Sequence, residues 1–142
     1  MILVEDDDGD AKAVRRALSR AQVPLTLIRA RDGVDALSLI RGESGTPPRH
    51  YILFVDLNMP RMNGLELLSE IRADPRLSHA VIFVMTTSSD DRDVAAAFSH
   101  HVAGYLVKAQ VGSDYGDLVG IVERYARAVE VPDMAALGVG LR

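Results

Sequence analysis

The stretch YILFVDLNMPRMNG, residues 51–64, places an acid directly behind a run of apolar side chains. Residues 51–55 are rich in aromatic and β-branched residues, which is typical of a strand buried on both faces. Asp56 follows this run at once. Either Asp56 is simply the first polar residue where the strand meets water, or its carboxylate is held at the strand tip for chemistry. The rest of the sequence decides between these interpretations.

Other short apolar runs alternate with stretches whose apolar residues recur at helical spacing. Such alternation predicts an α/β fold, in which five parallel strands are joined by right-handed crossovers and helices cover both faces of the sheet. The predicted strands are residues 1–4, 25–30, 51–55, 80–85 and 104–107, and the predicted helices are residues 11–21, 33–40, 65–72, about 91–101 and about 113–129.

The composition of the chain narrows the possible functions. It has 142 residues, no cysteine, a net charge of -4 and no block of Lys and Arg, so thiolate metal sites, disulfides and direct nucleic-acid binding are not expected. No apolar run approaches the roughly 20 residues that cross a bilayer, and no signal peptide is recognisable. We therefore expect a soluble, cytoplasmic protein that does not contact membranes.

Two segments fall outside the alternating pattern. Residues 42–50 contain two Gly and two Pro, which predicts a loop before the third strand. The periodicity ends after Pro132. We therefore expect one domain over residues 1–130 and a C-terminal tail, residues 131–142, that is loosely ordered or used in an interface.

The residues that follow each strand carry the functional prediction. Ligands of open parallel sheets bind beyond the carboxyl ends of the strands, so side chains placed there converge on one edge. Polar residues follow four of the predicted strands: Glu5, Asp6, Asp7, Asp8 and Asp10 after the first, Asp56 after the third, Thr86 after the fourth and Lys108 after the fifth.

The acids after the first strand divide into two groups. Those within residues 7–10 are interpreted as helix-capping residues, because the first turn of a helix favours carboxylates. Glu5 and Asp6 lie too close to the strand end for capping, and beside Asp56 they would place three like charges in one pocket. A hard divalent cation with oxygen ligands offsets such charge, and Mg²⁺ suits a shallow site with few carboxylates.

Thr86 and Lys108 complete the predicted site. Each alone has an ordinary interpretation, as a turn residue or as a solvated lysine. Together with Asp56 they supply a nucleophile, a hydroxyl group and an ammonium group from three strands. This set suits a phosphoryl group bound to a carboxylate, because Asp56 can attack phosphorus while the two donors each bind an oxygen.

Four motifs in order, VED (residues 4–6), VDLNMPRMNG (55–64), MTTSS (85–89) and GYLVK (104–108), resemble the receiver domain of two-component response regulators. The resemblance implies a doubly wound, flavodoxin-like fold with strand order 2-1-3-4-5, a Mg²⁺ cofactor and phosphorylation by a sensor histidine kinase. It also implies individual roles: Asp56 as phosphoacceptor, Glu5 and Asp6 as metal ligands with Asp56 and the Asn58 carbonyl, Thr86 as switch hydroxyl, Tyr105 as switch aromatic and Lys108 as the phosphate-pairing lysine.

The chain is similar to stand-alone, chemotaxis-regulator-like receivers, which are not enzymes in their own right. Its long loop at residues 42–50, together with TTSS (86–89) and LNMPRMNG (57–64), is similar to the small response regulators paired with phytochrome-type histidine kinases. The resemblance implies that phosphorylation alters the face formed by the fourth helix, fifth strand and fifth helix, which the family often uses for homodimers. The sequence specifies neither the cognate kinase nor the downstream target.

One residue departs from the family pattern, which usually has a proline in a cis peptide after the lysine. Here Lys108 precedes Ala109, and a cis bond before a non-proline residue costs about 2.5–4 kcal/mol, so we predict a trans peptide. Two other interpretations stay open. Ala109 favours a pseudo-receiver that binds partners without being phosphorylated. An aspartate-nucleophile phosphatase typically has a second acid where this chain has Asn58.

Overall fold

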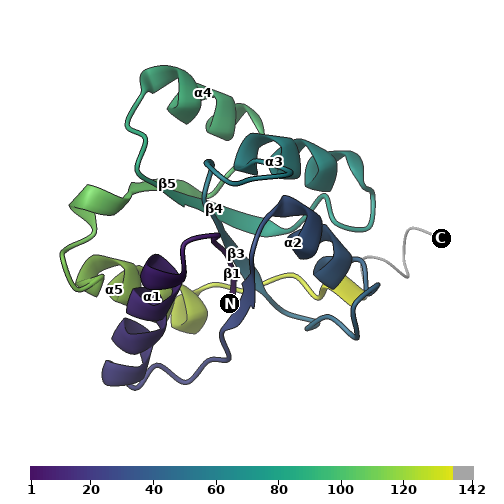
Figure 1. The fold of residues 1–142 in the computed structure, drawn as a ribbon. Helices are drawn as coiled ribbons and strands as arrows, with labels where there is room; N and C mark the ends of the chain where they lie inside the picture. Colours follow the sequence, from purple (N-terminus) through teal and green to yellow (C-terminus); the bar gives the residue numbers. More distant parts are fainter. Residues whose placement is uncertain (136–142) are drawn as a thin grey trace.

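The computed structural model describes residues 1–135, which form a five-stranded parallel sheet covered by helices on both faces (Figure 1). The strands are β1 (Ile2–Val4), β2 (Ile28–Ala30), β3 (Ile52–Val55), β4 (Val81–Thr86) and β5 (Gly104–Val107), and the helices are α1 (Asp8–Arg20), α2 (Gly33–Ile40), α3 (Gly64–Ala73), α4 (Asp91–Ser99) and α5 (Gly116–Ala128), with a 3-10 turn η1 (Lys108–Gln110). The strand order is β2-β1-β3-β4-β5, which confirms the predicted fold. Among residues 1–135, no helix is long and apolar enough to span a membrane.

Two apolar clusters hold the helices against the sheet. Helices α1 and α5 pack on one face, and α2, α3 and α4 pack on the other (Figure 1). Along β3 the side chains alternate between these clusters, so Leu53 and Val55 face one layer while Ile52 and Phe54 face the other. Each such side chain stabilises the fold by about 1.5–3 kcal/mol through burial. This explains why the strand is apolar at every position.

The register of the central strands brings the first and third strand tips together. Val4 at the end of β1 lies beside Val55 at the end of β3, and the Asp56 amide donates a hydrogen bond to the Val4 carbonyl at 3.0 Å. Glu5 and Asp56 therefore leave adjacent strands at the same level of the sheet. Their proximity follows from backbone pairing alone.

Some element boundaries differ from the prediction. β2 begins at Ile28 because β1 offers only three residues for pairing, and Leu25 and Leu27 pack instead against the α1 and α5 cluster. α5 begins at Gly116 because Tyr115 has a φ of 59°, in the left-handed region outside the helix. α4 ends at Ser99 because a positive φ follows at residue 101.

The segment after α5 packs against the loop before β3. The Met134 side chain is buried in the cluster on the α2 and α3 side, and its amide donates to the Arg49 carbonyl at 2.8 Å. Arg49 also forms an ion pair with Asp133. We predicted a tail that is loosely ordered or used in an interface, and residues 131–135 instead pack on the domain through one buried apolar side chain. The rest of the predicted tail, residues 136–142, lies outside the described residues, and a domain boundary at residue 130 stays a prediction.

Candidate functional site

Asp56 is buried at the end of β3, and both of its carboxylate oxygens accept hydrogen bonds. Oδ1 accepts from the Thr86 hydroxyl at 2.9 Å and from the Asn58 amide at 3.1 Å. Oδ2 accepts from the Lys108 ammonium at 3.2 Å. The hydroxyl comes from the end of β4 and the ammonium from the end of β5. The predicted convergence of three strand tips on one carboxylate is therefore present.

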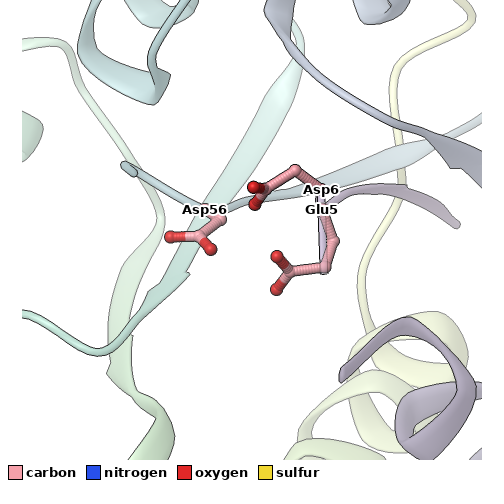
Figure 2. A group of neighbouring side chains, drawn as sticks. All are labelled: Glu5, Asp6 and Asp56. Carbon is pink, nitrogen blue, oxygen red and sulfur yellow. The ribbon is translucent and has the colours of Figure 1, made fainter. Parts of the chain in front are cut away.

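The carboxylates of Glu5, Asp6 and Asp56 face one space. Figure 2 shows Glu5 and Asp6, which follow β1, pointing toward Asp56, and one oxygen from each residue lies within 4.8 Å of the others. Glu5 is 1% exposed, whereas Asp6 is exposed. Burial raises the pKa of Glu5 to about 7, although its hydrogen bond to Lys108 opposes this shift. An arrangement of oxygen donors with excess negative charge fits a hard divalent cation.

The region around Asn58 belongs to the same site. The residues that line one open cavity include Asp6, Asn58 and Asp93 of α4. Asn58 also lies next to the acids through its amide, which donates to Asp56. Its backbone is thus held close to the carboxylates, as the predicted role of its carbonyl requires.

Lys108 is the central cation of the site, and its side chain is 10% exposed. The ammonium lies 2.6 Å from Glu5, 2.8 Å from Asp10 and 3.2 Å from Asp56. Burial disfavours the charge, but the hydrogen bonds to Asp10 and Glu5 outweigh it and raise the pKa of Lys108 above its ordinary value. The lysine is therefore charged and surrounded by acids.

The peptide after Lys108 is trans, as predicted, because residues 1–135 contain no cis peptide bond. The chain continues from Lys108 into the η1 turn. Ala109 in place of proline therefore leaves the ammonium within reach of Asp56.

Asp7, Asp8 and Asp10 lie at the start of α1 as predicted, but only Asp7 caps the helix with its side chain. Asp7 caps α1, since its carboxylate accepts from the Asp10 amide at 2.8 Å. Asp8 instead pairs with Arg29 at 2.6 Å, and Asp10 turns its carboxylate inward to Lys108. One sequence signal could have found this: Asp10 lies four residues before the core residue Val14, on the same face of α1.

The turn between β3 and α3 is fixed by close packing and by an ion pair that sequence reasoning missed. A Cβ at Gly64 would lie 2.5 Å from the Asp56 carbonyl oxygen, so only glycine lets α3 start this close to the strand tip. Arg61 in this turn donates to Asp32 at 2.6 and 3.0 Å, and Asp32 also caps α2. No spacing in the sequence links these two residues, because their contact depends on the order of the strands.

The predicted switch residues lie on adjacent strands. Thr86 is fully buried, and Tyr105 is half-buried with its ring against the core cluster on the α4 side. The Tyr105 hydroxyl donates to the Ser88 carbonyl at 2.9 Å in the loop that follows Thr86. Phe98 of α4 is 48% exposed, so apolar surface is present on the same side of the molecule.

Comparison with known families agrees with this geometry. The model of the response regulator receiver domain matches residues 1–118, most of the chain. The chain belongs to this family. The sequence resemblance is therefore confirmed, and this receiver domain is part of a two-component signalling system.

Similar proteins include the response regulator Rcp1 and a phytochrome response regulator, RcpA. Response regulator Rcp1 of Synechocystis sp. is 34% identical over 135 residues, which cover 93% of this chain and 92% of that protein. The crystal structure of the Mn²⁺-bound form of Rcp1 has a TM-score of 0.80 at 32% identity, covering 92% of this chain and 96% of that one. A structure of the phosphorylated cyanobacterial phytochrome response regulator RcpA has a TM-score of 0.80 at 29% identity, with the same coverage.

Proposed function

We propose that this receiver domain accepts a phosphoryl group on Asp56 from the phosphohistidine of a sensor histidine kinase. The observation that carries the proposal is the pairing of both Asp56 oxygens with donors, Thr86 on one side and Lys108 on the other. A receiver of this kind transmits a signal and is not an enzyme in its own right. A cytoplasmic location belongs to the same proposal, because the kinase domain and its phosphohistidine must be accessible.

The cofactor of this reaction is proposed to be Mg²⁺, bound by Glu5, Asp6 and Asp56 with the Asn58 backbone carbonyl. Three carboxylates with one exposed member support a shallow site that leaves room for water ligands. Mg²⁺, when bound, would neutralise charge on the phosphoryl oxygens and on the acids. The Mn²⁺-bound form of Rcp1 supports a divalent cation in a protein of this type.

The protein side chains contribute positioning and charge to the transfer. An Asp56 oxygen forms the new bond to phosphorus while the phosphorus–nitrogen bond of the donor breaks, and the histidine nitrogen keeps that electron pair. Thr86 and Lys108 then transfer their hydrogen bonds from the carboxylate to phosphoryl oxygens. Because both donors already contact Asp56, each lies close to the position that a phosphoryl oxygen would take.

The output is proposed to pass through Thr86 and Tyr105 to the face formed by α4, β5 and α5. Movement of the Thr86 hydroxyl toward a phosphoryl oxygen alters the start of the loop that Tyr105 holds through Ser88. A local change of charge can thereby change the outer surface of α4, including Phe98. This face is the proposed contact for a downstream target or for a second copy of the chain.

The input is proposed to come from a phytochrome-type histidine kinase. Similarity over nearly the full length to Rcp1 supports this pairing, since the related RcpA is described as a phytochrome response regulator. The pairing is tested by incubating the chain with a purified phytochrome kinase and measuring the transfer rate against that of an unrelated kinase.

Phosphorylation is tested by intact mass spectrometry after incubation with acetyl phosphate and Mg²⁺. The expected result is the addition of one phosphoryl group to the wild type and to Asp117→Asn, which removes an exposed acid from the first turn of α5. Asp56→Asn and a metal-free sample should gain none. If the wild type gains no mass from acetyl phosphate or from a kinase, the pseudo-receiver interpretation replaces this proposal.

The switch is tested separately at Tyr105. Tyr105→Phe removes the hydrogen bond to Ser88 and keeps the ring, whereas Tyr105→Ala removes both. We expect phosphorylation of Asp56 in both variants, with loss of the response at the α4, β5 and α5 face in Tyr105→Ala. Full retention of the response in Tyr105→Ala, measured as a phosphorylation-dependent change in amide exchange of α4, contradicts the switch role.

A further inference from the structure

Asp10 of α1 contacts Lys108 although it is neither the acceptor nor part of the proposed metal site. Within residues 1–135, the Lys108 ammonium donates to three carboxylates, those of Glu5, Asp10 and Asp56. An ammonium group has three N–H donors, so each carboxylate can take one. Together the three acceptors fix both the place of the nitrogen and the direction of each donor.

This inference rests on the proposed function, in which the three carboxylates have different roles. Glu5 is a proposed metal ligand, and Asp56 is both a ligand and the acceptor. In the proposed loaded state their oxygens are engaged by Mg²⁺ and by phosphorus, which weakens them as partners of Lys108. Asp10 alone keeps a free carboxylate for the ammonium group.

Asp10 is itself held in place. Its amide donates to Asp7 in the first turn of α1, so its backbone position is fixed by the helix cap. Its second oxygen lies 3.4 Å from the hydroxyl of Tyr115, a buried residue directly before α5. Asp10 therefore links the start of α1 to the loop between β5 and α5, which carries the lysine.

We infer that Asp10 is a positioning residue, which holds the Lys108 ammonium in place when the phosphoryl group binds at Asp56. Lysine has a long flexible side chain, and an ammonium group that loses two of its three partners must be ordered again at a cost in entropy. A fixed third partner removes much of this cost. The remaining N–H groups can then turn to a phosphoryl oxygen without displacing the nitrogen.

The contact between Asp10 and Lys108 has a second effect, which would weaken the binding of a phosphoryl group. Asp10 carries a negative charge, and it could compete with the phosphoryl oxygens for Lys108 or repel them. If competition dominates, removal of the charge strengthens the binding of a phosphoryl group. The two effects therefore have opposite signs in one measurement, the affinity for a phosphoryl mimic at saturating Mg²⁺.

The test uses beryllofluoride, which forms a phosphoryl-like adduct with a carboxylate, and follows the bound form by ¹⁹F NMR. Asp10→Asn keeps the size of the side chain and removes its charge. We expect its affinity for beryllofluoride at saturating Mg²⁺ to fall about tenfold, the usual effect of losing a hydrogen bond between charged groups. Mg²⁺ affinity, measured separately by calorimetry, should change much less. Asp117→Asn should match the wild type in both measurements.

A double-mutant cycle separates positioning from a general effect on the fold. In a Lys108→Met background, Asp10→Asn should cause no further loss of beryllofluoride affinity, because its effect passes through the lysine. An equal loss in both backgrounds, or unchanged or tighter binding by Asp10→Asn alone, overturns the positioning role. If the wild type fails to bind beryllofluoride with Mg²⁺, the proposed function fails and this inference fails with it.

Discussion

The two edges of the sheet each use an ion pair to join segments far apart in the sequence, but in different surroundings. At the carboxyl edge, Lys108 meets Glu5 across 103 residues, and the two side chains are 10% and 1% exposed. At the amino edge, Arg49 meets Asp133 across 84 residues, and these side chains are 67% and 25% exposed. The contacts are alike in chemistry and differ in their access to water.

This difference indicates what each contact contributes. Burying charges costs several kcal/mol per ion, so a buried pair is a weak source of net stability, although breaking it is expensive. The carboxyl edge also holds more acids than bases, which no stability requirement explains. At the amino edge the apolar side chain of Met134 supplies the packing, and the exposed ion pair adds little. Of these two edges, the carboxyl edge is the one where carboxylates outnumber cations, as expected of a site that binds a metal ion.

Removal of the buried cation should have the largest effect. Lys108→Met leaves the surrounding carboxylates without their cation, and we expect the free energy of unfolding at pH 8 to fall by about 3 kcal/mol. The loss should be smaller at pH 6, because burial raises the pKa of Glu5 to about 7 and a protonated Glu5 no longer needs the ammonium. Urea denaturation at both pH values measures the effect.

A matched variant at an exposed pair controls for the loss of a positive charge. Arg127 pairs with Glu123 one turn earlier on α5, and its side chain is 77% exposed. Arg127→Met should cost less than about 0.5 kcal/mol. If Lys108→Met lowers the free energy of unfolding by no more than this, or by an amount independent of pH, the ion pairs of Lys108 contribute no more than an exposed surface pair.

Metal affinity should depend on pH in a way that reports the burial of Glu5. A carboxylate must lose its proton to bind Mg²⁺, and burial raises the pKa of Glu5 to about 7. Below this pKa a proton competes with Mg²⁺ for the Glu5 carboxylate, and above it this competition ends. We therefore expect Mg²⁺ to bind about tenfold more tightly at pH 8 than at pH 6, with proton release on binding, as measured by calorimetry in two buffers. Equal affinity at both pH values would contradict the role of Glu5.

The fold was largely predictable because it depends on local patterns. Gly104–Val107 and Gly33–Ile40 form as predicted, since apolar periodicity sets both elements. β2 is shorter than its apolar run because strand length depends on the partner strand, which the run itself does not contain. Met134 was missed for a related reason, because a single anchoring side chain creates no periodicity.

The site was predictable only where residues lie at or directly after the ends of strands. Glu5, Asp56, Thr86 and Lys108 were placed correctly on one edge, because parallel strands bring their tips together. For Asp10, the capping interpretation placed the residue in the first turn of α1 but missed its contact with Lys108, because an acid at this turn suits either role. Choosing between them requires the position of Lys108, which only the folded sheet supplies.

Neutralising the acceptor should have a smaller effect, of opposite sign to that of Lys108→Met. Asp56 lies within 4.8 Å of two other acids, so Asp56→Asn removes repulsion while keeping an oxygen for the Thr86 hydroxyl. We expect the free energy of unfolding without metal to rise by about 1 kcal/mol. Added Mg²⁺ should stabilise the wild type more than the variant and reduce the difference. If Asp56→Asn lowered the free energy of unfolding without metal, the Asp56 carboxylate would stabilise the fold.

The smallest effect is expected at the amino edge. Arg49→Ala removes one side of the exposed pair with Asp133, and exposed pairs of this kind contribute about 0.2–1 kcal/mol. The Arg49 carbonyl, which accepts from the Met134 amide, remains in the variant. Met134→Ala is the matched change at the same edge and should cost about 2–3 kcal/mol, because it removes a buried side chain. Urea denaturation of both variants measures the difference. If Arg49→Ala proved as costly as Met134→Ala, the ion pair would anchor the segment after α5, and exposure would no longer distinguish the two edges of the sheet.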